Sequence, residues 1–158
     1  MSNEVYGYLE WNHPIDSEKM LTTIQQSTNL GIERITIEEL YNFPEKLLPA
    51  DKDKCLPFII GDRPGKTNST YLIDYLDYAP EADIGLPVNG KERLMILLDF
   101  LKIMFVHSKC DRFVVAITDS SQIEESKVVS LDKMNAEIMS DFEQCAPPDC
   151  VYEIVKET

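Results

Sequence analysis

Short runs of β-branched and aromatic residues recur along the chain and predict strands. Two clear examples are "VYGYLEW" near the N-terminus and "RFVVAIT" in the second half. Runs of this length, bounded by turn-forming residues, are typical of strands rather than helices. The predicted strands span residues 5–11, 34–37, 56–60, 112–118, 127–131 and 151–155.

Apolar residues at helical spacing predict two amphipathic helices. The first opens at Asp16 and ends before Gly31, where a C-terminal glycine is expected. Asp132 caps the second, and Pro147 forbids its continuation. Their apolar stripes comprise Met20, Leu21 and Ile24 in the first helix and Met134, Ile138, Phe142 and Cys145 in the second.

A longer helix is predicted over residues 89–107. Asn89 can cap it, and Glu92 stands three residues further on, which is a variant of the capping box. Its apolar residues cover nearly the whole circumference, and this pattern predicts a central helix that packs on several sides.

The order of these elements predicts an α+β fold. Strands and helices are interspersed, but several connections are too short for βαβ crossovers, and Pro44 breaks any long helix between residues 38 and 48. We expect a single domain over residues 1–158, with a mixed or mostly antiparallel sheet packed on a long central apolar helix and two amphipathic helices. An α/β fold with a mixed sheet is the alternative.

Residues 61–67 are similar to a phosphate-binding loop, but their spacing is wrong. A P-loop has four residues between its first glycine and the Gly-Lys-Ser/Thr triplet, whereas three residues separate Gly61 from Gly65. Pro64 removes a backbone N–H donor, and Asp62 would place a carboxylate against phosphate charge. We therefore predict a turn that binds no nucleotide.

The chain is strongly acidic. Its 28 acidic and 15 basic residues give a formal net charge of −13. Nucleic acids and anionic membranes attract Lys and Arg, so this composition argues against both as partners. High negative charge is often only a means of keeping a protein soluble, but it also suits a cationic partner that the complementary field attracts.

The residues show no catalytic or metal-binding constellation. The cysteines, at positions 55, 110, 145 and 150, form no CxxC pair, and neither His13 nor His107 stands at ligand spacing from one of them. We expect free thiols, no metal, no cofactor and a non-enzymatic role. Without a membrane-spanning stretch or a signal peptide, the expected location is the cytoplasm.

One segment differs from a generic acidic surface. Residues 71–85, "YLIDYLDYAPEADIG", interleave tyrosines with carboxylates and contain no Lys or Arg. Tyrosine is favoured at interfaces, and carboxylates beside it would meet basic groups of a partner. The alternative is a core element with a solvated polar side. The predicted partner-binding residues are Asp74, Tyr75, Asp77, Tyr78, Glu81 and Asp83.

Three stretches carry a resemblance that covers most of the chain: "YGYLEW", "LMILLDFLKIMF" and "MSDFEQCAPPDCVYEI". In these the sequence resembles immunity proteins of bacterial polymorphic-toxin and contact-dependent growth-inhibition systems. The resemblance implies a non-enzymatic inhibitor of a cognate toxin C-terminal domain, often a basic nuclease. Two alternatives stay open: a small cytosolic enzyme or enzyme subunit acting on a cationic or neutral small molecule, and a regulatory subunit of a housekeeping assembly.

Overall fold

Six strands form one mixed sheet in the order β2-β3-β1-β4-β6-β5. The computed structural model describes residues 3–28, 30–60, 73, 86–119, 121–142 and 147–156. All neighbouring strands are antiparallel except β5 and β6, which are parallel and connected through α4. The predicted α+β class with a mixed sheet is confirmed. The strands are β1 (Asn3–Glu10), β2 (Ile32–Arg34), β3 (Cys55–Ile60), β4 (Arg112–Asp119), β5 (Glu125–Ser130) and β6 (Cys150–Val155).

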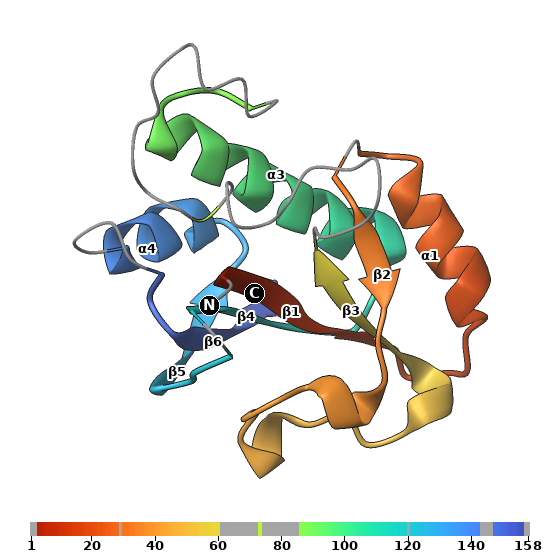
Figure 1. Cartoon of the computed structure of the whole chain (residues 1–158). Helices are drawn as coiled ribbons and strands as arrows, with labels where there is room; N and C mark the ends of the chain where they lie inside the picture. The colour runs from red at the N-terminus through yellow and green to blue at the C-terminus, as the bar shows by residue number, and fades with distance from the viewer. Residues whose placement is uncertain are drawn as a thin grey trace.

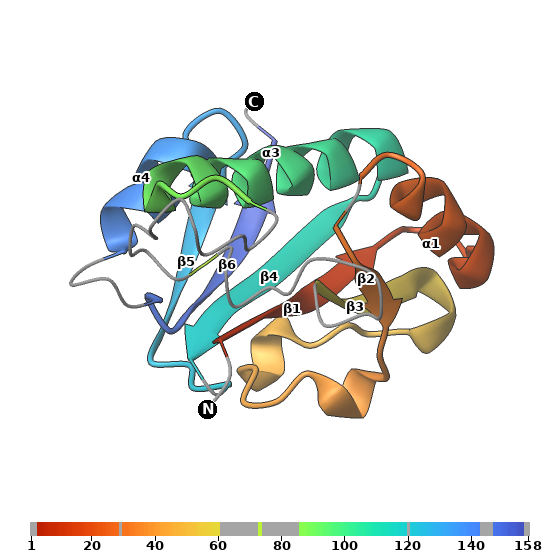
Figure 2. The same cartoon turned by 45° about the horizontal axis from the view of Figure 1, so that its top comes forward.

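Three helices cover one face of this sheet, as Figures 1 and 2 show: α1 (Ser17–Gln25), α3 (Gly90–Ser108) and α4 (Met134–Asp141). Because side chains alternate along a strand, every second residue of the inner strands points at the helices. Val5 and Leu9 of β1 and Phe113 and Val115 of β4 are fully buried there. The main hydrophobic core therefore lies between the helices and the sheet.

The other face is partly covered by the segment between β2 and β3, residues 35–54, which we call the connector (Figure 2). It contains the 3₁₀ turns η1 (Ile37–Glu39), η2 (Glu45–Leu47) and η3 (Lys52–Lys54). Leu40, Phe43 and Leu47 of the connector form a second buried cluster with Tyr6 and Tyr8 of β1. The sheet is thus buried on both faces near its centre, which explains why β4 is apolar on both sides.

The long helix forms where the sequence predicts it. The Asn89 side chain accepts a hydrogen bond from the Glu92 N–H at 3.1 Å and caps α3. Much of the helix is buried, but Asp99 is exposed and Val106 is 55% exposed. The helix therefore lies on the sheet with one side open to solvent.

Several predicted boundaries are wrong. α1 ends at Gln25 rather than near Gly31, because the Gln25 amide bonds to the backbone of Leu30 and Ile32 and begins the turn into β2. β2 ends at Arg34, since the next residues turn into η1. α4 begins at Met134 without a side-chain cap, so the predicted cap at Asp132 is also incorrect. α4 ends at Asp141, so Phe142, which the pattern placed in the helix, lies outside it in an extended conformation.

Several sequence predictions fall outside the described residues. These concern the loop at 61–67, the six proposed partner-binding residues at 74–83, and Cys145. They stay predictions. Among the helices that the structure describes, none combines the length and apolarity needed to cross a bilayer.

Candidate functional site

Strand pairing brings three charged side chains together on the connector face of the sheet. Glu10 at the end of β1 pairs directly with Arg112 at the start of β4. Glu153 of β6 pairs with Val114, two residues further along β4 on the same face. Alternation along the strands therefore places two carboxylates beside one guanidinium.

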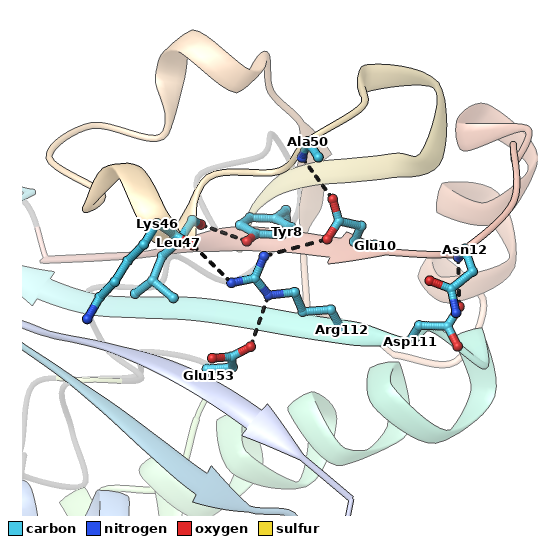
Figure 3. A network of polar contacts seen from close by, with 9 residues as sticks. All are labelled: Tyr8, Glu10, Asn12, Lys46, Leu47, Ala50, Asp111, Arg112 and Glu153. Carbon is cyan, nitrogen blue, oxygen red and sulfur yellow. Dashed lines mark hydrogen bonds and ion pairs between the residues drawn. The ribbon is translucent and has the colours of Figure 1, made fainter.

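Arg112 is at the centre of this group (Figure 3). Its Nε donates to Glu153 Oε2 at 2.9 Å, and its Nη1 lies 3.7 Å from Glu10 Oε1. The guanidinium carbon lies 5.9 Å from the centroid of the Tyr8 ring. Desolvation by burial acts to lower the pKa of Arg112, but Tyr8, Glu153 and Glu10 outweigh it and the net pKa is raised.

The same group holds the connector against the sheet. Arg112 Nη2 donates to the Lys46 carbonyl at 3.2 Å, and the Tyr8 hydroxyl donates to the Leu47 carbonyl at 2.6 Å. The backbone N–H of Ala50 donates to Glu10 Oε2 at 3.0 Å. The contacts with Lys46, Leu47 and Ala50 are therefore structural, because they anchor the connector, which lacks regular strands and long helices.

An open depression of about 600 Å³ lies beside Arg112. Carboxylates from Glu10, Asp51, Asp111 and Glu153 line it, together with Lys54 and Arg112. Asp111 is fixed there, since its Oδ2 accepts the Asn12 N–H at 2.8 Å (Figure 3). The lining carries two more acidic than basic side chains, which suits a cationic group better than an anion.

The described cysteines are poor nucleophiles. Cys55, Cys110 and Cys150 are free and buried. Desolvation by burial raises the pKa of Cys55 to about 11 and that of Cys150 to about 12. These thiols are therefore protonated at neutral pH. Within the described part of the chain, no group of three or more metal-binding side chains is placed to hold an ion.

Glu10, Arg112 and Glu153 were not predicted from the sequence as site residues. The signal was present, because each is a charged residue within or at the end of an apolar strand. The charges of Arg112 and of the two glutamates are opposite in sign. The sequence, however, does not show which strands are neighbours in the sheet. Of the proposed acidic-aromatic segment the structure describes only Ile73, which is fully buried in the helix-side core.

Neither the fold nor the site leads to a known relative. No protein-family model matches the chain, and searches of curated proteins and of solved structures found no significant match.

Proposed function

We propose that this chain is a non-enzymatic immunity protein that binds and neutralises a cognate bacterial toxin domain, a basic nuclease. The observation that carries the proposal is the net charge of −13. Nucleases bind the phosphate backbone of nucleic acids through surfaces rich in Lys and Arg. An acidic protein attracts such a basic surface at long range. The resemblance of the sequence to immunity proteins agrees with this role.

The depression beside Arg112 supports the same proposal. It presents Asp51 and Asp111 beside Glu10 and Glu153, which already pair with Arg112. Lysine and arginine side chains of a partner can pair with such carboxylates, and close charge pairs across an interface couple by roughly 1.5–7 kcal/mol. The predicted segment with Asp74, Tyr75, Asp77, Tyr78, Glu81 and Asp83 would supply further carboxylates to such a partner.

The depression also suits a second candidate function. A volume of about 600 Å³ with acidic walls can admit a small cationic molecule. The chain would then be a small enzyme or enzyme subunit acting on such a molecule. Calorimetric titration with spermidine tests this alternative: micromolar binding without toxin neutralisation would favour it over the immunity role.

The test of the immunity role begins with the gene neighbourhood. We expect a large secreted protein encoded immediately upstream, whose C-terminal domain stops growth when expressed alone. Co-expression of this chain should restore growth, and the two purified domains should bind. Normal growth arrest in the presence of this chain would contradict the proposal.

Two charge-matched variants localise the contact. Asp74→Asn with Asp77→Asn should slow association with the toxin domain at low salt, and the difference from wild type should vanish at high salt. Asp99→Asn with Glu137→Gln removes the same charge from exposed positions on α3 and α4. Equal kinetics for the two double variants would show that the segment at 74–83 is not the contact.

A further inference from the structure

The connector presents one aromatic side chain to solvent. Tyr41 is 55% exposed, and within the described residues it is the only aromatic among the exposed large hydrophobic side chains. Its neighbours Leu40 and Phe43 are buried, with exposures of 4% and 8%. The Tyr41 ring is therefore held at the surface by a turn that is fixed in the core on both sides.

The backbone of this turn is also fixed. The Tyr6 hydroxyl donates to the Tyr41 carbonyl at 2.7 Å. Asn42 has a φ of 66°, and its side-chain amide donates to the Ser121 carbonyl at 2.7 Å. Asparagine tolerates this left-handed conformation better than most residues do. Little conformational entropy remains to be lost when a partner contacts the ring.

The surroundings of the turn are mainly acidic. Hydrogen bonds join four chain segments here: Ser121 bonds to both Asn42 and Glu4, and Asp149 bonds to Asp119. These segments, residues 3–6, 37–45, 119–125 and 147–150, contain eight carboxylates. Two lysines flank them: Lys46 follows Glu45, and Lys127 Nζ lies 3.8 Å from Glu125 Oε1. The exposed ones are Glu38, Glu45, Glu124 and Glu125.

We propose that the Tyr41 turn is a docking point for a Lys- and Arg-rich protein surface on this chain. The inference rests on the proposed function and names the place of contact. A tyrosine ring contributes apolar area and a π face that attracts ammonium and guanidinium groups. The surrounding glutamates pair with further basic groups and speed the encounter. A single exposed aromatic ring is common on protein surfaces and does not by itself indicate a partner. The negative charge around Tyr41 is what indicates a basic partner.

The turn and the depression beside Arg112 belong to the same face of the sheet. Tyr6, which bonds to the turn, and Glu10, which lines the depression, are separated by roughly 13 Å along β1. A protein partner of ordinary size spans that distance. The Tyr41 turn and the acidic depression therefore both lie on the connector side of the sheet, and separate substitutions can test each of them.

Affinity for the upstream-encoded toxin domain tests the inference. Tyr41→Ala should weaken binding on the order of 30-fold, as expected for a hot-spot aromatic residue, mainly through faster dissociation. Val106→Ala is the matched control, because Val106 is also 55% exposed but lies on α3 across the sheet. Its affinity should stay within about twofold of wild type. Equal binding by wild type and Tyr41→Ala would overturn the docking point and leave the immunity role intact.

A defined cationic probe tests the surface without a toxin. Titration with a peptide of nine arginines, followed by backbone amide NMR, should shift the signals of residues 38–45 and 119–125 more than those of α1 and α4. Tyr41→Ala should reduce these shifts, while Val106→Ala should not. Shifts centred elsewhere, or spread evenly over the domain, would overturn the inference. Failure of the toxin domain to bind wild type would instead overturn the proposed function.

Discussion

Arg112 of β4 donates a hydrogen bond from Nε to Glu153 Oε2 of β6 at 2.9 Å, while its Nη2 reaches the connector at the Lys46 carbonyl. One side chain therefore joins two strands of the sheet to the segment that covers them (Figure 3). The Arg112 and Glu153 side chains are 28% and 26% exposed, so water screens their attraction only in part.

A double-mutant cycle should measure this coupling. Arg112→Met should lower the free energy of unfolding by roughly 1–3 kcal/mol, because the Lys46 carbonyl and the Glu153 carboxylate lose their donor and Glu10 loses its ion-pair partner. Glu153→Gln should cost less, and the coupling energy in urea denaturation should be about 1 kcal/mol. Glu125→Gln is the control, since Glu125 lies 3.8 Å from Lys127 and is 54% exposed. A coupling energy near zero would show that the Arg112 network does not stabilise the fold.

Gly7 should not tolerate a side chain. It pairs with Val115 of β4, and a Cβ added to it would lie 2.0 Å from the Val114 carbonyl oxygen. A backbone atom of a central strand cannot move away without disrupting the ladder. Gly7→Ala should therefore destabilise the protein by more than roughly 3 kcal/mol in urea denaturation. Ser126→Ala, at an exposed position of β5, should change stability by less than about 0.5 kcal/mol. Similar midpoints for the two variants would contradict the close approach of β1 and β4.

Two positions on α3 should respond differently to truncation. Leu101 is fully buried, so Leu101→Ala should cost roughly 2–5 kcal/mol of unfolding free energy. Val106 is 55% exposed, and Val106→Ala should cost about 0.5 kcal/mol or less. Thermal or urea denaturation of both variants measures the difference. A shift of under about 1 kcal/mol for Leu101→Ala would place the helix at the periphery.

Alkaline pH should weaken the contact between β1 and the connector. Desolvation by burial raises the pKa of Tyr6 from 10.0 to about 12. A raised pKa in the folded state means that the stabilisation is fully present below about pH 10 and is lost as the pH rises through about 12. Wild type should therefore lose more stability over this range than Tyr6→Phe, which has no phenol to ionise. A constant stability difference between wild type and Tyr6→Phe from pH 8 to 12, measured in urea, would contradict the raised pKa.

The apolar patterns predicted most of the helices and strands, because burial of one side of a helix or strand requires apolar residues at regular spacing in the sequence. "RFVVAIT" predicted a strand, and β4 confirms it with one end residue added. The capped pattern at Asn89 predicted the start of α3. The boundary at Gly31 failed because local capping preferences compete with contacts between more distant residues. At α1 the Gln25 amide bonds to the backbone of Leu30 and Ile32, and no propensity encodes that contact.

The candidate site could be predicted less well than the fold. The acidic character of the surface follows from composition, because 28 acidic residues must lie mostly on the outside. The proximity of Glu10, Arg112 and Glu153 does not follow, because these residues lie far apart in the chain. Their meeting depends on the order β1-β4-β6 and on a register that pairs Glu10 with Arg112.

The sequence by itself determined the class of the fold, the positions of most strands and helices, and the charge that any partner meets. These properties depend on local periodicity and on counts of residues. Only the tertiary structure decided that α1, α3 and α4 share one face of the sheet, and that the connector partly covers the other. It also decided that Tyr41 is exposed while Tyr6 and Tyr8 are buried. The sequence does not show which of these three tyrosines is exposed. Strand pairing and long-range packing decide it.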